Sequence, residues 1–281
     1  MKQKIKDILI RSPYNITNGF ANFIKKQESD DAGQTFGTQF EYYYGGKFEK
    51  DKWYDKTEDD ERNHFIEMLS CSEGDLILNA GFGNHTLLKS LNKLPAEFVG
   101  IDSNKVVGKV YRKLKNYKNI TIMKADIFNM PFKDESFDKI WCSGVIHHTP
   151  DPEKALQKLV KVLKKNGRIY LMIYGKRPSP YLFFKKIFPN TYKWKDEIIF
   201  FISYYFAFVL SLPIIIWRLC FDFRWRTVTH TIRRIALGIY DSISCKYLFR
   251  YSEKEVRDMF ERNGLEYEKV GFWQYVGRKV K

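Results

Sequence analysis

The stretch LILNAGFGNHT, residues 76–86, has the order of a buried strand, a glycine turn and the start of a helix. Gly81 and Gly83 let the backbone bend tightly and approach a ligand closely, because neither residue carries a Cβ atom. A nucleotide-binding loop usually has an acid at the position of Asn79 and a third glycine at the position of His85. Taken alone, the stretch therefore fits a ligand-binding turn or an ordinary tight turn.

Short apolar runs and helical segments alternate on both sides of this turn. Continuous apolar runs are typical of strands buried on both faces of a parallel sheet. After Pro152 the apolar side chains recur at helical spacing, with Asp151 placed to cap the helix and Gly167 just past its end. The runs are residues 75–80, 97–102, 120–126, 137–144 and 167–174. The alternation predicts an α/β protein with a Rossmann-like, doubly wound sheet.

Acidic residues stand at the ends of the next two predicted strands. Asp102 lies 23 residues after Asn79, where a carboxylate can accept hydrogen bonds from both hydroxyls of a ribose. The alternative is a capped helix start, which Ser103 could supply. Asp126 ends the third strand, where it could accept from an adenine amino group while Ile127 packs on the ring. A plain turn residue is the alternative for Asp126.

These features resemble the class I S-adenosylmethionine-dependent methyltransferases, and among them the small-molecule branch called methyltransferase type 11. The resemblance covers about Asp75–Tyr174 and Tyr251–Gly271. Its most specific part is FDKIWCSGVIHHTPDPEKAL, residues 137–156. The resemblance implies a seven-stranded sheet whose last strand is antiparallel, and S-adenosyl-L-methionine as the cofactor.

The resemblance also implies a set of residues in contact with that cofactor, with Ser143 or Gly144 near its methionine end. Family members usually have an acid at the Asn79 position, where it orders the cofactor's ammonium group. Asn79 can still accept a hydrogen bond there but adds no charge, which keeps a non-catalytic relative open as an alternative. The candidate cofactor-binding residues are Asn79, Gly81, Gly83, Asp102, Ser103, Asp126, Ile127 and Ser143.

Two adjacent histidines are the candidates for catalysis. His147 and His148 follow the fourth predicted strand, at the rim where methyl transfer would occur. Histidine titrates near neutral pH, so either imidazole could take a proton from a hydroxyl acceptor. The alternative is that HHTPDP, residues 147–152, only builds the turn into the next helix. We expect no metal, because no cluster of metal-ligating residues occurs in the sequence.

The overall composition favours an anionic partner. The net charge is +15, and residues 176–250 supply +9 of it, with 13 Lys and Arg against 4 Asp and Glu. Four scattered cysteines without a CxxC motif predict a reducing compartment. The N-terminal residues lack the apolar core of a signal peptide, so we interpret them as mature protein. No tetrapeptide that holds a flipped base follows the fourth strand, so we expect no nucleic-acid substrate.

The basic segment also contains the most apolar run of the chain. Residues 198–217 are 20 residues without a charge, long enough to span a bilayer. A single crossing would place the last strands on the far side of the membrane, and Pro213 interrupts the run. The segment is therefore interpreted either as a cap or dimer contact, or as a helical element held at an anionic membrane surface through residues 181–226.

The sequence divides into residues 1–54, an N-terminal arm or lid, 55–175, the cofactor-binding core, 176–250, the hydrophobic basic insert, and 251–281, a C-terminal helix and strands that complete the sheet. The predicted function is methyl transfer from S-adenosylmethionine to a small-molecule or lipid-like acceptor. A nicotinamide-dependent oxidoreductase is the other enzyme class considered. The predicted location is cytoplasmic, with a peripheral or monotopic position at the inner membrane as the alternative. For the oligomeric state, the sequence leaves a homodimer as one alternative.

Overall fold

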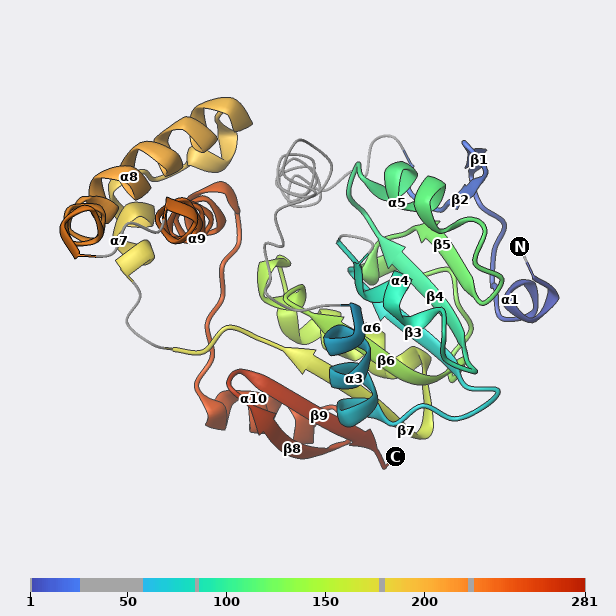
Figure 1. Cartoon of the computed structure of the whole chain (residues 1–281). Coiled ribbons are helices and arrows are strands. Elements are labelled where there is room, and N and C mark those ends of the chain that lie inside the picture. The colour runs from blue at the N-terminus through green and yellow to red at the C-terminus, as the bar shows by residue number, and fades with distance from the viewer. Residues whose placement is uncertain (1, 26–57, 84–85, 177–179, 222–224, 281) are drawn as a thin grey trace. The chain divides into compact units, whose positions relative to one another are not determined.

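The structure is a computed structural model that describes residues 2–25, 58–83, 86–176, 180–221 and 225–280. It consists of two compact units (Figure 1). The first combines residues 1–176 with 249–281, and the second is residues 177–248. His85 and residues 26–54 of the predicted arm lie outside the described residues.

Five parallel strands form the centre of the first unit. β3 has β4 on one side and β6 on the other, and the strand order β5-β4-β3-β6-β7 confirms the doubly wound prediction. A ligand of such a sheet binds at the carboxyl ends of the strands, where the order reverses. The bounds are Leu76–Ala80 for β3, Glu97–Asp102 for β4, Ile120–Lys124 for β5, Phe137–Ser143 for β6 and Leu163–Met172 for β7. The reversal at β3 thus places the quoted glycine turn at the expected ligand edge.

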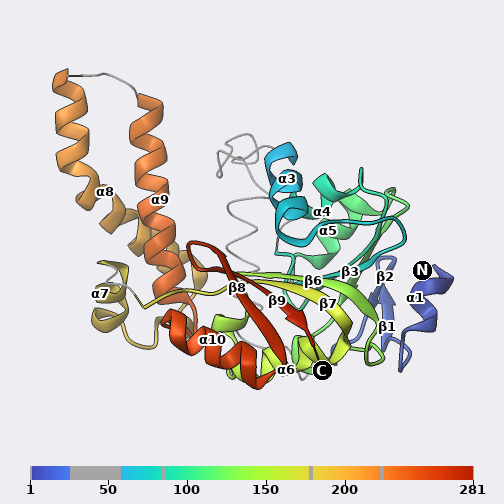
Figure 2. The same ribbon diagram turned by 90° about the horizontal axis from the view of Figure 1, so that it is seen from below.

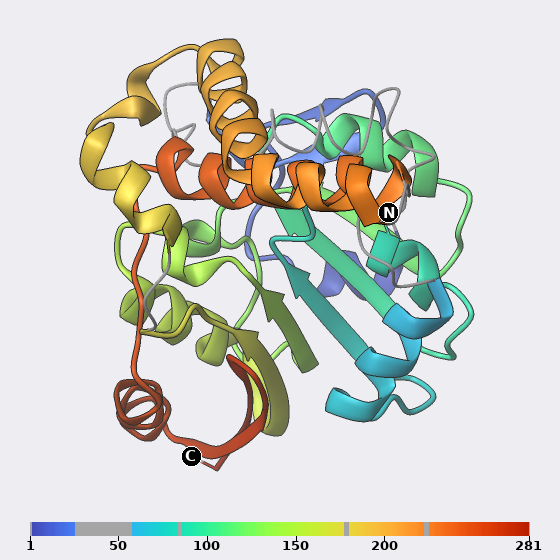
Figure 3. The ribbon, with the colours of Figure 1, turned by 60° about the vertical axis from the view of Figure 1, so that its left-hand side comes forward.

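The C-terminal strands complete one edge of the sheet. β8, Leu265–Gly271, and β9, Gln274–Lys279, form a hairpin, and β9 inserts between β7 and β8. β9 is antiparallel to both neighbours, which confirms the prediction for the last strand. Figure 3 shows this red hairpin at the edge of the sheet.

The opposite edge corrects the predicted strand number. The sheet has nine strands instead of seven, because β1, Asn15–Thr17, and β2, Phe20–Asn22, extend it beyond β5. Asn18 and Gly19 join them with φ angles of 50° and 95°. Two residues with positive φ make the hairpin turn whose twist matches that of the strands. Residues 15–17 and 20–22 of the predicted arm therefore belong to the sheet itself.

Helices cover both faces of the sheet (Figure 2). α3, Glu58–Leu69, α4, Thr86–Leu91, and α5, Val107–Leu114, pack on one face. α1, Gln3–Asp7, α6, Pro152–Val162, and α10, Glu253–Arg262, pack on the other. The caps of two helices follow the sequence: Asp151 accepts from the Lys154 N–H at 2.9 Å, and Ser252 forms a capping box with Glu255.

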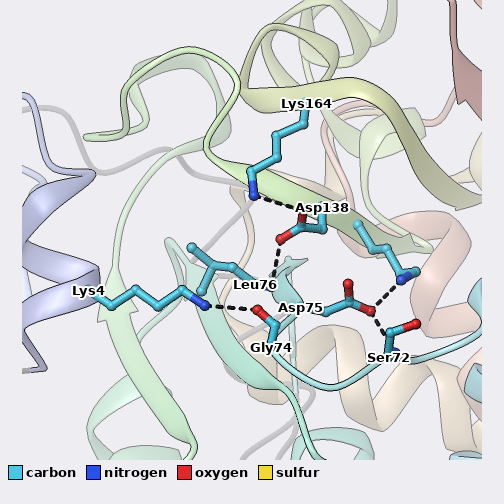
Figure 4. A network of polar contacts seen from close by, with 8 residues as sticks. Lys4, Ser72, Gly74, Asp75, Leu76, Asp138 and Lys164 are labelled. Atoms are coloured by element: carbon cyan, nitrogen blue, oxygen red, sulfur yellow. Dashed lines mark hydrogen bonds and ion pairs between the residues drawn. The ribbon is translucent and has the colours of Figure 1, made fainter.

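A polar network ties the amino ends of the strands together (Figure 4). The Asp138 carboxylate accepts from the Leu76 N–H at 2.9 Å and pairs with Lys164 at 2.7 Å. Burial raises the pKa of Asp138, but these partners outweigh that effect and the net shift is downward. Asp75 accepts from the Ser72 N–H at 2.7 Å, and Lys4 donates to the Gly74 carbonyl at 2.9 Å. The end of the sheet away from the glycine turn is therefore closed by structural ion pairs.

The second unit is helical. It contains α7, Pro180–Ile187, a short 3-10 turn η3, Thr191–Lys193, and the long helices α8, Asp196–Phe221, and α9, Trp225–Ser244. α8 and α9 run beside each other as an antiparallel pair (Figure 2). Pro213 does not end α8, contrary to the expected interruption, and it is exposed within the helix. Among the described residues, one helix, α8, is long and apolar enough to cross a membrane.

Candidate functional site

The glycine turn after β3 has a backbone conformation in which residues other than glycine would be strained. Gly81 has a φ of 74° and Gly83 a φ of 55°, both in the left-handed region. The Gly81 N–H donates to the Ile101 carbonyl at 2.8 Å. A Cβ atom on Gly81 would lie 2.4 Å from Cγ2 of Val145. The turn therefore approaches the segment after β6 so closely that only glycine fits.

Asp102, at the end of β4, is joined directly to this turn. One carboxylate oxygen accepts from the Gly83 N–H at 2.8 Å, and the other accepts from the Asn104 N–H at 3.0 Å. Burial raises the pKa of Asp102, while the N–H groups of Asn104, Gly83 and Ser103 partly offset this. Ser103 does not cap the following helix, because α5 begins after Val106 without a side-chain cap. No side chain therefore caps α5, although Asp102 closes a local turn through its bond from the Asn104 N–H.

Asp126 caps a turn, as its alternative interpretation expected. It precedes the 3-10 turn η1, Ile127–Asn129, and accepts from the Phe128 N–H at 2.9 Å. Ile127 is buried beside it. Asp126 follows β5 by two residues, so it stands at the same edge of the sheet as Asp102. The capping bond explains the residue by itself, and contact with a cofactor stays a prediction.

Asn79 and Ser143 belong to the two strands at the centre of the site. Asn79 lies next to Gly100 of β4 and Trp141 of β6 in the strand register, and it is 3% exposed. Ser143 is the last residue of β6. The side chain of Ser143 is hydrogen-bonded to the hydroxyl of Tyr170 on β7, whose burial raises its pKa. Tyr170 therefore stays protonated.

Sequence reasoning missed the aromatic support beneath Ser143. The ring of Tyr170 stacks on Trp141, with centroids 3.8 Å apart and planes at 11°. His64 of α3 meets both rings edge-on, at centroid distances of 5.7 and 5.8 Å. Tyr170 lies within the run that predicted β7, but its contact with Ser143 depends on the strand register. That register is not readable from one sequence.

His147 and His148 lie in the 3-10 turn η2, Ile146–His148, and their rings contact each other at a centroid distance of 4.2 Å. Both are buried, His147 completely. The His147 ring also lies 4.1 Å from the ring of Tyr174. Burial, with the charges of His148 and Arg250, holds the pKa of His147 well below 6.5. Within the described part of the chain, neither nitrogen of His147 has a hydrogen-bond partner.

The structure therefore brings the predicted residues to one edge of one sheet. Asn79, Gly81, Gly83, Asp102, Ser103, Asp126, Ile127, Ser143, His147 and His148 all lie at, or just past, the carboxyl ends of β3 to β6. The described residues contain no group of three His, Cys, Asp or Glu side chains that could hold a metal ion. The edge thus offers hydrogen-bond acceptors, a glycine turn and imidazoles.

Comparison with protein families identifies the core. Residues 78–171 match the family model described as a methyltransferase domain, which runs from β3 through β7 and includes every residue of the site. This segment is a methyltransferase domain. It resembles the class I methyltransferases, whose cofactor is S-adenosylmethionine. The close turn at Gly81 and the acceptors at Asp102 fit that cofactor's adenosine.

Known proteins resemble the methyltransferase domain over part of their length. An uncharacterized methyltransferase, YcgJ of Bacillus subtilis, is 30% identical over 121 residues, covering 42% of this chain and 47% of that protein. A ubiquinone biosynthesis O-methyltransferase of Alkalilimnicola ehrlichii is 27% identical over 124 residues, covering 43% and 50%. The chain thus spans about half the length of these relatives.

A solved structure shares the fold more broadly. It is a methyltransferase chain from a complex with the Haloferax volcanii Trm112 methyltransferase activator, with a TM-score of 0.51 and 14% identity. The match covers 92% of this chain and 100% of that one. At this identity the likeness concerns the fold alone.

Proposed function

We propose that this chain transfers a methyl group from S-adenosylmethionine to a small, lipid-like acceptor at a membrane surface. The observation that carries the proposal is the direct bond between Gly83 and Asp102 at the carboxyl edge of the sheet, inside a methyltransferase domain. This bond places a glycine turn and a carboxylate side by side, as the adenosine of the cofactor requires. The remaining candidates extend from there along the same edge.

Each residue has a defined task at this edge. S-adenosylmethionine, when bound, supplies a methyl group on a positively charged sulfur. Asp102 accepts from the ribose hydroxyls with the lone pairs that its two backbone donors leave over. Asp126 and Ile127 face the adenine, and Ser143 and Asn79 hold the methionine end. Catalysis then consists mainly of holding donor and acceptor in line, which by itself lowers the barrier substantially.

A proton acceptor is needed when the methyl acceptor is a hydroxyl. We assign this role to the pair His147 and His148. The ring nitrogens of His147 have no hydrogen-bond partner among the described residues. Burial holds the pKa of His147 well below 6.5, so its imidazole is neutral but a weak base, and the proposal depends on the acceptor's proton being taken by the pair rather than by His147 alone. His147→Phe and His148→Phe should each slow transfer to a phenol by about 100-fold or more, with cofactor affinity unchanged. If the pair only packs the turn, these variants keep the wild-type rate.

Two observations support a lipid-like acceptor. The relative from Alkalilimnicola ehrlichii is named for ubiquinone biosynthesis. The second unit of this chain carries a long, largely exposed apolar helix, which suits contact with a membrane where such acceptors dissolve. We place the protein in the cytoplasm, at the inner membrane surface.

Two assays test the function. In the first, S-adenosylmethionine is titrated into the protein by calorimetry, with NAD⁺ as the comparison; we expect binding of the former only. In the second, S-adenosylmethionine with a tritiated methyl group is incubated with the protein and a bacterial lipid extract. Tritium in the organic phase supports the proposal. Cofactor binding without label transfer, to this extract or to a panel of phenols and amines, would indicate the non-catalytic alternative.

A further inference from the structure

Helix α8 buries a narrow, small-residue face within the second unit. Ile199, Ser203, Ala207 and Ser211 recur every four residues and are buried. The Ser203 hydroxyl donates to the Ile199 carbonyl at 2.7 Å, and the Ser211 hydroxyl to the Ala207 carbonyl at 2.6 Å. Both hydroxyls are thus satisfied inside the helix. α9 contributes Ala236, Ile239, Tyr240 and Ile243 to the same core.

The outer face of α8 is more apolar than this inner one. We define it as Phe201, Tyr205, Phe208, Leu212 and Ile216, which are 36–71% exposed. Their spacing of three or four residues places them on one side of the helix. An ordinary surface helix has its polar residues on that side. Large exposed apolar patches mark surfaces that bind another apolar phase.

Basic and aromatic side chains stand at the start of the apolar run. Lys186 lies in the last turn of α7, and Lys193 and Lys195 flank Trp194 just before α8; all four side chains are exposed. Trp217, at the other end of the run, is also exposed. Tryptophan beside lysine is characteristic of the interface between lipid headgroups and acyl chains. Asp196 and Glu197 in the first turn of α8 offset part of this charge, but residues 176–250 as a whole carry +9, which complements an anionic leaflet.

The fold excludes a single crossing of the membrane by α8. The strands before and after the second unit, β7 and β8, belong to one sheet, so both ends of the α8–α9 pair are on the same side. α9 packs along α8 and carries Arg233 and the exposed Arg234 midway. Arginine at the centre of a bilayer is unfavourable. α8 therefore fits a position in the plane of one leaflet.

We propose that the outer face of α8 inserts into one leaflet of an anionic phospholipid bilayer, with Lys186, Lys193 and Lys195 on the headgroups. The inference deepens the proposed function and rests on it, because a bilayer surface is where a lipid-like acceptor is held. Docking is measured without turnover, so the two can fail separately: loss of docking leaves methyl transfer to a soluble acceptor intact.

The test is flotation of the full chain with vesicles of phosphatidylcholine, with or without about 30% phosphatidylglycerol. Wild type should float with the anionic vesicles. Phe201→Gln/Phe208→Gln/Ile216→Gln should float at least about tenfold less. Ile10→Gln/Ile16→Gln/Phe272→Gln is the matched control, since it removes three equally exposed apolar side chains of the first unit and should float like wild type.

A second measurement does not depend on the folding of the triple variant. Lys186→Gln/Lys193→Gln/Lys195→Gln changes only exposed charges and should weaken flotation, as should added salt with the wild type. Flotation of the outer-face triple variant at the wild-type level would overturn the proposal. A wild type that floats with neither kind of vesicle would also overturn it. Light scattering would then show whether the outer face of α8 is a dimer contact, because in that case the wild type is a dimer and the triple variant is a monomer.

Discussion

The backbone N–H of Gly83 donates to the carboxylate of Asp102 at 2.8 Å. The glycine turn after β3 and the acid at the end of β4 are therefore one hydrogen-bonded unit, although 19 residues separate them. This bond fixes the carboxylate beside the turn before any ligand arrives. Burial of the carboxylate raises the pKa of Asp102, and the backbone N–H donors limit that rise. In the function that we propose, this carboxylate accepts from the ribose, and the bond to Gly83 holds it in position before the cofactor binds.

Asp102→Ala should weaken S-adenosylmethionine binding by about 100-fold or more. The substitution removes two ribose hydrogen bonds, each to a charged acceptor and worth about 1.5–3 kcal/mol, and it leaves the Gly83 N–H without its acceptor. Asp102→Asn is the matched control, because one oxygen remains, and its loss should be smaller. Calorimetric titration measures both. An unchanged dissociation constant in Asp102→Ala would remove Asp102 from the site.

Much of the fold was readable because buried parallel strands have an unambiguous apolar signature. The run EFVGID, residues 97–102, became β4 without a change of bounds. The end of α6 was less clear: Leu163 fits the apolar face of the helix, yet it begins β7 and pairs with Phe137. Local periodicity does not resolve such a boundary, since tertiary pairing decides it.

The extra strands at the N-terminal edge were indicated by the Asn18-Gly19 dipeptide, but the basic residues around it led us to interpret this segment as an arm. Asn-Gly between two short segments is the strongest local indication of a tight hairpin, and Asn18-Gly19 forms one. Each strand has only three residues, too few to show an alternating pattern. At the site, residues at strand ends were predictable because parallel strands share an edge. The contacts across strands, such as Ser143 with Tyr170, were not, because they depend on register.

Gly81→Ala should lower the free energy of unfolding by about 2–5 kcal/mol. The left-handed backbone costs about 1–2 kcal/mol for an L residue, and the clash with Val145 adds about 1–3 kcal/mol. Gly74→Ala is the control: its φ is 80°, but nothing lies within 4 Å of the new Cβ. It should lose only the backbone part. Denaturant unfolding measures both, and equal losses would contradict the close approach to Val145.

Tyr170→Phe should lower cofactor affinity by roughly 3–10-fold and stability by about 1 kcal/mol. The ring keeps its stacking on Trp141, while Ser143 loses the hydroxyl that holds it. Tyr240→Phe is the control, because it removes a buried tyrosine hydroxyl of the second unit, bonded to Asp196 at 3.4 Å. That variant should bind the cofactor normally. If both variants bind alike, Ser143 does not contact the methionine end.

The buried His147 should make stability fall as the pH drops below about 6.5. Its pKa is depressed in the folded chain, so the unfolded chain binds more protons in this window and is favoured. The loss should grow steadily as the pH falls below about 6.5, and it should be absent in His147→Phe. Phenylalanine keeps the packing on His148 and Tyr174. Parallel pH profiles of unfolding midpoints for the two proteins would show that His147 does not resist protonation.

Asn79→Asp should separate folding from cofactor binding. A carboxylate at this position is almost completely buried between β4 and β6, so without ligand the variant should lose about 1–3 kcal/mol at pH 8. The same charge should strengthen binding of S-adenosylmethionine several-fold by attracting its ammonium group. Methylthioadenosine, which lacks the amino-acid portion, is the control ligand, and its affinity should not change. If calorimetry finds the two ligands affected alike, Asn79 does not face the ammonium group.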